Sequence, residues 1–199
     1  MEKLKKKYLF LFIIIIAGII MGVLFSNILS VSDEKLVYTK LTLFFNNLKD
    51  DVPIDFIANL LTSLKNNFIY LITIWILGLS VIGLILNNFI LFFKSFVLGF
   101  SIGSIINIYL YGGLVLSFVY VFPSILINLF IYTIMVYYAN NFSLCLFNVL
   151  FRKKEYKFSK LIIKYAKLLG YCAIALVISS LLETFLTPFL IKLFSFLIK

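Results

Sequence analysis

The sequence predicts an all-α integral membrane protein: a single membrane domain, residues 1–199, with about five transmembrane helices and short amphipathic helices at the membrane surface. Hydrophobic residues make up 63% of the chain and charged residues 13%, whereas soluble domains average about 45–50% and 25%. The apolar residues also form runs of roughly 17 to 25, the length that crosses a hydrocarbon core about 30 Å thick. No soluble core could bury this much apolar surface, so lipid is the expected solvent.

The first predicted span covers residues 8–29 and follows the lysine-rich segment Glu2 to Lys7. This apolar run is longer than the 7–15 residues typical of the apolar core of a cleavable signal peptide, so we expect it to remain as a helix. In the loop that follows, residues 32–67, the apolar residues recur at helical spacing on both sides of Pro53. Two short amphipathic helices are therefore expected there, with Pro53 in the first turn of the second.

Four more spans complete the prediction. A polar boundary from Asn87 to Lys94 separates the second span from the third, and Gly112 with Gly113 forms a tight turn before the fourth. Pro123 interrupts the fourth span, which is tolerated where neighbouring groups satisfy the freed carbonyl. The four spans are expected at residues 68–86, 95–110, 114–139 and 168–186.

The fifth span has a basic segment before it and an apolar tail after it. The basic segment, residues 140–167, is expected in the cytoplasm because of its charge. The tail after Pro188 is too short to cross a membrane. We expect it to rest on the outer leaflet or to dip into it.

The distribution of Lys and Arg predicts the orientation of the chain. The loop of residues 32–67 holds four lysines against five acidic residues, so it is net negative. Because basic residues are retained in the cytoplasm, the N-terminus should lie on the cytoplasmic side of the cell membrane and the C-terminus on the outer side. The formal net charge of +10 is thereby explained by topology, and we expect no nucleic-acid partner. Twelve of the eighteen basic residues fall in the predicted inner segments: Lys3, Lys5, Lys6, Lys7, Lys94, Arg152, Lys153, Lys154, Lys157, Lys160, Lys164 and Lys167.

The residues that usually carry chemistry are scarce. Histidine, the commonest general base and metal ligand, is absent from the sequence. Cys145 and Cys172 are not spaced as a metal or redox motif, and Ser117, Ser124 and Ser179 have no neighbouring base in the sequence. We therefore expect no enzymatic activity and no cofactor or metal. One intramembrane carboxylate and no internal repeat also argue against an ion-coupled transporter.

A set of five lysines is spaced 4, 3, 4 and 3 residues apart, which puts all five on one helical face. Such a face is attracted to anionic headgroups of the inner leaflet, and docking to an acidic cytoplasmic partner is the alternative. The five are Lys153, Lys157, Lys160, Lys164 and Lys167.

Small residues repeat every four positions in the first and third spans, a pattern that lets two helices approach closely in lipid. The sequence leaves open whether this packing occurs within one subunit or between copies in a homo-oligomer. The residues are Gly18, Gly22, Ser95, Gly99 and Gly103.

Glu183 is the acidic residue inside an apolar stretch, and an intramembrane carboxylate is a functional hypothesis by default. It lies about fifteen residues into the last span, so we place it in the outer leaflet. We expect a structural role, satisfying polar or backbone groups near Pro188, rather than proton relay; contact with a partner is a third reading.

The apolar residues of the outer loop are candidate contacts with an extracytoplasmic or membrane-embedded partner. The alternative is that they rest on the outer leaflet or cap the bundle. They are Leu41, Phe44, Phe45, Ile57 and Leu61.

Several separated stretches resemble the stage II sporulation protein M family of spore-forming bacteria. Trp75 to Gly83 is similar to its WxLGxSxxG-type segment, and Lys94 to Gly103 to its KGFxxGFxxG-type segment. Pro123 matches a proline of the fourth span, and Glu183 to Pro188 resembles the ExFxTP-type ending. Two positions depart from the pattern: Ser95 stands in place of Gly, and Phe122-Pro123-Ser124 in place of Leu-Pro-Gln.

The resemblance implies a non-enzymatic scaffold in the mother-cell membrane that engulfs the forespore. Such a scaffold would recruit and position two peptidoglycan hydrolases, stage II sporulation proteins P and D, at the septal or engulfing membrane. The alternative from another class is a permease-like subunit of an ABC-type transporter, whose contact with a cytoplasmic ATPase would lie between Lys153 and Lys167. A neighbouring ATPase gene would favour this alternative.

Overall fold

The computed structural model of the chain describes residues 2–49, 55–121, 124–152 and 158–194, and these residues form helices joined by short turns. Five of the helices are long and apolar enough to cross a membrane, which confirms the predicted all-α membrane fold with five spans. The helices are α1 (Glu2–Ser26), α2 (Val31–Lys49), α3 (Phe56–Gly78), α4 (Gly83–Val121), α5 (Ser124–Arg152) and α6 (Phe158–Leu193).

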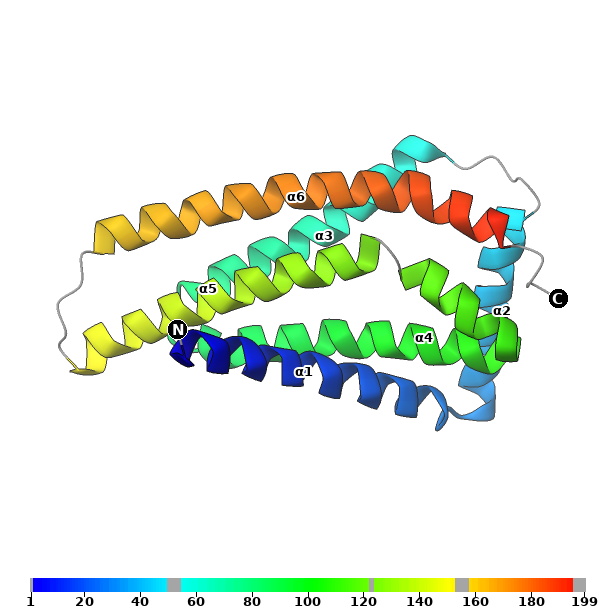
Figure 1. Ribbon diagram of the computed structural model, residues 1–199, viewed down its shortest axis with the longest axis horizontal. Helices are drawn as coiled ribbons and strands as arrows, with labels where there is room; N and C mark the ends of the chain where they lie inside the picture. Colours follow the sequence, from blue (N-terminus) through cyan, green and yellow to red (C-terminus); the bar gives the residue numbers. More distant parts are fainter. Residues whose placement is uncertain (1, 50–54, 122–123, 153–157, 195–199) are drawn as a thin grey trace.

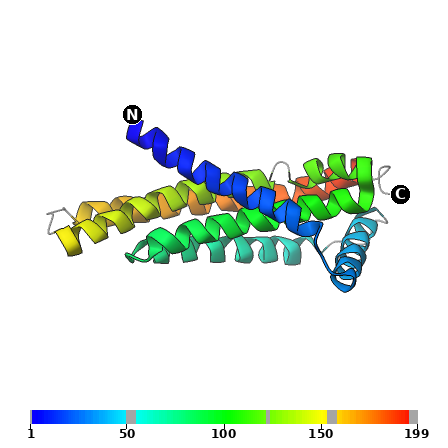
Figure 2. The same cartoon turned by 90° about the horizontal axis from the view of Figure 1, so that it is seen from below.

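The five long helices lie along the longest axis of the molecule, and α2 lies across one end of them (Figures 1 and 2). We call the end where α1 begins the basic end, because α1 there carries Lys6 and Lys7 and α6 carries Lys160 and Lys164. The opposite end, crossed by α2, is the far end. At the basic end α5 and α6 extend past the other helices (Figure 1). Helix α1 begins and α6 ends at opposite ends of the bundle, as an odd number of spans requires.

The second predicted span, residues 68–86, differs from the structure because a turn divides it. Helix α3 ends at Gly78, and α4 begins at Gly83. The Ser80 hydroxyl accepts a hydrogen bond from the Gly83 N–H (3.1 Å), which caps the first turn of α4, and Ser143 of α5 donates to the Ser80 carbonyl (2.6 Å). The turn is composed largely of apolar residues, so hydropathy alone does not reveal it.

The third predicted span, residues 95–110, is part of a longer helix. Helix α4 runs from Gly83 to the far end and reverses at Leu110, where φ is 48° and ψ is −122°. Leucine rarely adopts such a backbone conformation, which costs about 1–3 kcal/mol. Residues 111–121, which we call the return arm, then run back beside α4 (Figure 1).

The predicted tight turn at Gly112 and Gly113 therefore lies two to three residues too late. Both glycines are helical in the return arm. A Cβ at Gly113 would stand 2.7 Å from the Cα of Ile106, so this glycine allows the arm to approach α4 closely. Its role is close packing after the reversal, and the reversal itself falls on Leu110.

The fourth predicted span, residues 114–139, is divided between two helices. The return arm ends at Val121, and α5 begins at Ser124 and continues to Arg152. Pro123 lies outside the described residues. The predicted basic segment, residues 140–167, is helix throughout its described part: the first part belongs to α5 and the last part to α6. Apolar side chains are frequent between 142 and 151, which supports the longer helix.

The fifth predicted span, residues 168–186, is the middle of a longer helix. Helix α6 begins at Phe158 and passes through Pro188 to Leu193, so the described part of the tail continues the helix. Proline removes one backbone donor, and in lipid the freed carbonyl needs a neighbouring partner.

The outer loop contains one surface helix, α2, and the start of a spanning one. Helix α3 already begins at Phe56, capped by Asp55, whose carboxylate accepts from the Ala58 N–H (3.1 Å). The second short amphipathic helix predicted in residues 32–67 is therefore the first part of a span. Pro53 lies outside the described residues.

Two hydrophobic cores hold the helices together. The larger core fills the space between α1, α3, α4, α5 and α6, with fully buried side chains that include Leu71, Leu91, Met135 and Leu176. The smaller core lies at the far end, where Phe45 of α2 contacts the return arm and the ends of α4 and α6. It thereby attaches the surface helix to the bundle.

Candidate functional site

A network of hydrogen-bonded polar side chains lies buried between three spanning helices, and we call it the polar cluster. Its centre is Asn67 of α3, which is 5% exposed. The Asn67 Nδ2 donates to Ser180 Oγ of α6 (3.0 Å) and to Ser63 Oγ (3.3 Å). Its Oδ1 accepts from Tyr132 of α5 (2.9 Å) and from Asn128 of α5 (3.4 Å). One amide thus ties α3 to α5 and α6 with its full bonding capacity in use. The members are Ser63, Asn67, Asn128, Tyr132, Ser180 and Glu183.

Glu183 joins the polar cluster through α3. Its Oε2 accepts from Ser63 Oγ (2.7 Å), and Asn67 Nδ2, whose two hydrogens already serve Ser180 and Ser63, lies 3.5 Å away. The polar groups beside this carboxylate thus belong to α3, whereas the prediction placed them near Pro188. A half-buried carboxylate in an apolar protein is costly, and the bond from Ser63 lowers that cost.

Lys94 lies inside a spanning helix beside the polar cluster. Its Nζ stands 3.9 Å from the centroid of the Tyr70 ring and 5.7 Å from that of Tyr132, and it interacts electrostatically with Glu183. It stands eleven residues from the start of α4, about 16 Å along the helix. This corrects the predicted boundary at Asn87 to Lys94, and it leaves eleven of the twelve basic residues assigned to the inner side.

The start of α5 lies against α6 close to Glu183. The Ser124 and Thr187 hydroxyls are 3.4 Å apart, and Asn128 of α5 belongs to the polar cluster. The start of α5 is attached to α6, because Ser179 Oγ donates to the Ser124 carbonyl (3.1 Å). A helix that begins inside a bundle presents the positive end of its dipole there, which favours a nearby carboxylate.

The small residues of α1 and α4 face one another, and we call this contact the α1–α4 seam. A Cβ at Gly18 would stand 2.8 Å from the Cβ of Ser95, and one at Gly99 would stand 2.7 Å from the Cα of Ile19. Gly22 and Gly103 are as tightly placed, against Phe96 and Ser26. Of the two arrangements that the sequence leaves open, the structure forms the one within a single chain.

The five candidate contacts of the outer loop separate into three kinds. Phe45 is fully buried in the far-end core and Leu41 packs against that core, so neither is available to a partner in this conformation. Phe44 is partly exposed beside Tyr120. Ile57 and Leu61 are exposed on α3, a spanning helix, where lipid is the expected neighbour.

The described part of the lysine face lies on α6. Lys160, Lys164 and Lys167 are exposed side chains of its first turns, whereas Lys153 and Lys157 lie outside the described residues. Within the described ranges, no three His, Cys, Asp or Glu side chains come together in a way that could bind a metal ion.

Sequence reasoning missed most of the polar cluster, including Asn67 and Tyr132, and it missed Lys94 beside the cluster. The signal in the sequence was that Asn67 and Lys94 are polar residues next to apolar stretches. The prediction interpreted both as ends of spans. The stretches that resemble a known family lie where helices connect to one another or pack against one another. Trp75 to Gly83 contains the α3–α4 turn, Lys94 to Gly103 contributes the α4 side of the seam, and Glu183 belongs to the polar cluster.

The chain matches a known protein family over most of its length. No curated protein and no solved structure shows a significant match to the chain. The family model of stage II sporulation protein M matches residues 11–188, a range that begins in α1, ends at Pro188 of α6 and contains the seam and the polar cluster. This match describes a sporulation-related membrane protein. The five described helices that are long and apolar enough to span a membrane are consistent with it. Because the match extends over most of its length, the chain belongs to the stage II sporulation protein M family.

Proposed function

We propose that the protein is a non-enzymatic membrane scaffold of the engulfment machinery. It recruits and positions peptidoglycan hydrolases, stage II sporulation proteins P and D, at the septal or engulfing membrane of the mother cell. The observation that supports this most is family membership over residues 11–188. The orientation predicted from the basic residues adds that the far end faces the cell wall, where such hydrolases act.

The contact surface proposed for these partners is the outward face of α2. Leu36 and Leu43 are seven residues apart, so they lie on the same side of the helix, and they are 54% and 57% exposed. The other side of α2 is held against the bundle by Phe45. An apolar face on a helix that is fixed from behind suits a partner that binds a helix in a groove.

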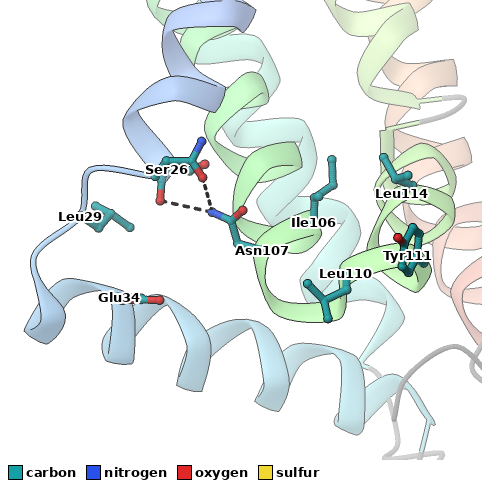
Figure 3. A pocket seen from close by; sticks show the side chains of 9 residues that line it. Ser26, Leu29, Glu34, Ile106, Asn107, Leu110, Tyr111 and Leu114 are labelled. Atoms are coloured by element: carbon teal, nitrogen blue, oxygen red, sulfur yellow. Dashed lines mark hydrogen bonds between the residues drawn. The ribbon is translucent and has the colours of Figure 1, made fainter.

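A hollow of about 560 Å³ lies on the bundle side of α2, between the end of α1, the start of α2 and the reversal of α4 (Figure 3). Asn107 of α4 fixes its wall, because its Nδ2 donates to Asn27 Oδ1 (2.9 Å) and to the Ser26 carbonyl (3.4 Å). Tyr111 at the start of the return arm is 91% exposed at the same place. An aromatic side chain this accessible is of the kind that anchors protein interfaces.

Photocrosslinking in sporulating cells tests the proposal. A photoreactive amino acid at Leu36 or Leu43 should crosslink to a peptidoglycan hydrolase, whereas the same amino acid at Ile163, which is 53% exposed near the basic end, should not. The double variant Leu36→Glu/Leu43→Glu should reduce hydrolase retention at an unchanged amount of protein in the membrane. Crosslinks to lipid alone, or to a hydrolase only from position 163, would contradict the proposed surface.

A further inference from the structure

Two apolar grooves flank α5 toward the basic end. The α1 groove, about 340 Å³, lies between α1, α4 and α5, and its lining includes Lys6, Lys7, Phe10, Leu84, Asn141 and Leu144. The α6 groove, about 410 Å³, lies between α5 and α6, and its lining includes Asn141, Cys145, Leu161, Lys164, Lys167 and Tyr171. Both have the size of ordinary ligand sites.

Each groove combines one pair of lysines with an apolar wall in the same order along the bundle. In α1, Lys6 and Lys7 come before Phe10, so the charges lie nearer the basic end. In α6, which also begins at the basic end, Lys164 and Lys167 come before Tyr171. A phospholipid of that leaflet has the same order, with phosphate at the surface and acyl chains below it.

The charged edge of the α1 groove is held in place by neighbouring side chains. Lys7 Nζ donates to Asn141 Oδ1 (2.5 Å), and the Tyr8 and Tyr137 rings stack with their centroids 4.3 Å apart. A lysine ammonium has three donors. The bond to Asn141 thereby positions the Lys7 ammonium and leaves two of its N–H donors for a phosphate.

We propose that the α1 groove and the α6 groove each bind one anionic phospholipid of the leaflet at the basic end. The lysine pair binds the phosphate, and the apolar wall holds an acyl chain. Basic pockets between spanning helices on the cytoplasmic side suit this chemistry, and the predicted orientation makes the leaflet the inner one. An acidic protein segment fits less well, because the walls below the lysines are largely apolar and offer few partners to its charged groups.

Native mass spectrometry of the full chain in mild detergent, titrated with phosphatidylglycerol, tests the proposal. The wild type should bind two molecules saturably, and phosphatidylcholine with the same chains should bind at least tenfold more weakly. A lysine near the surface contributes roughly fivefold in affinity, so Lys6→Gln/Lys7→Gln should weaken one site about 30-fold. Lys164→Gln/Lys167→Gln should weaken the other site by the same factor.

The matched control removes two lysines from the far end, Lys35→Gln/Lys40→Gln on α2, and should leave binding unchanged. Equal loss in this control would show general charge attraction and overturn the proposal, as would equal binding of phosphatidylcholine.

A second variant tests the apolar wall without changing the charge. Leu144→Trp fills the α1 groove, and it should remove one bound lipid while the protein still elutes as a single species. Soluble glycerol phosphate should not compete, because it lacks the acyl chain. Unchanged lipid binding in Leu144→Trp would refute the proposal that the α1 groove binds a phospholipid. Displacement of the bound lipid by an equal concentration of glycerol phosphate would refute it as well.

Discussion

The α1–α4 seam predicts that the same substitution has opposite effects at two glycines. At Gly99 an added Cβ would stand 2.7 Å from the Cα of Ile19, about 0.7 Å closer than the 3.4 Å at which ordinary contact begins. The obstacle is backbone, which cannot rotate away, so α1 and α4 must separate. At Gly170 of α6 an added Cβ would meet no atom within 4 Å. Gly170→Ala is therefore the matched control, because it makes the same substitution in another helix of the protein where no atom obstructs it.

The expected magnitude follows from this displacement. A gap of 0.5–1 Å forfeits about a quarter to a half of each atomic attraction along the seam, and overpacking of this kind typically costs about 1–3 kcal/mol. Gly99→Ala should lower the free energy of unfolding by that amount. Gly170→Ala should raise it by about 0.5–1 kcal/mol, because alanine is the better helix former and nothing obstructs it.

Equilibrium unfolding in mixed micelles of a mild detergent and sodium dodecyl sulfate, followed by circular dichroism, measures both variants. The two midpoints should move in opposite directions from the wild type. If Gly99→Ala were as stable as Gly170→Ala, the helices would not approach as closely at Ile19 as the structure requires, and the reasoning from the seam would fail.

Four further outcomes are expected. Asn67→Leu should lose about 2 kcal/mol of unfolding free energy, from three interhelical bonds at about 0.6 kcal/mol each, and the wild-type stability would contradict the role of Asn67. A double-mutant cycle of Lys94→Met and Glu183→Gln should give a coupling of about 1 kcal/mol, and additivity would show that the charges are independent. Asn87→Leu should stabilise the protein by about 1 kcal/mol, because the buried Asn87 amide has no hydrogen-bond partner among the described residues; lower stability would reveal one. A reporter fused at the C-terminus should be active only outside the cytoplasm, and cytoplasmic activity would overturn the orientation.

The number of spanning helices and the facing glycines could be predicted because both depend on local sequence. An apolar run predicts a span wherever it occurs, and Gly18 and Gly22 mark a close approach by their spacing alone. Which helix would meet α1 was open, since small residues in α4 can pair with α1 of the same chain or of another. The structure resolves this with contacts such as that between Gly18 and Ser95.

The helix boundaries and the polar cluster could not be predicted in the same way. The α3–α4 turn contains Leu79, Val81 and Ile82, so the apolar pattern continues through it without a break. Asn87 and Lys94 then seemed to be the only available polar boundary, although both lie within α4. Asn67 bonds to residues 61 to 116 positions away, and no periodicity in the sequence carries that information.

The return arm has a consequence for the order in which the chain is assembled. As a helix its eleven residues extend about 16 Å, half of a hydrocarbon core about 30 Å thick. A machinery that releases helices into lipid by their hydrophobic length can therefore insert α4, but it cannot insert the arm as a segment of its own. The start of α5 is attached through Ser179 of α6, which is synthesised after α5. This attachment therefore forms only after translation has passed Ser179, and a nascent chain that stops before Ser179 leaves the start of α5 without it.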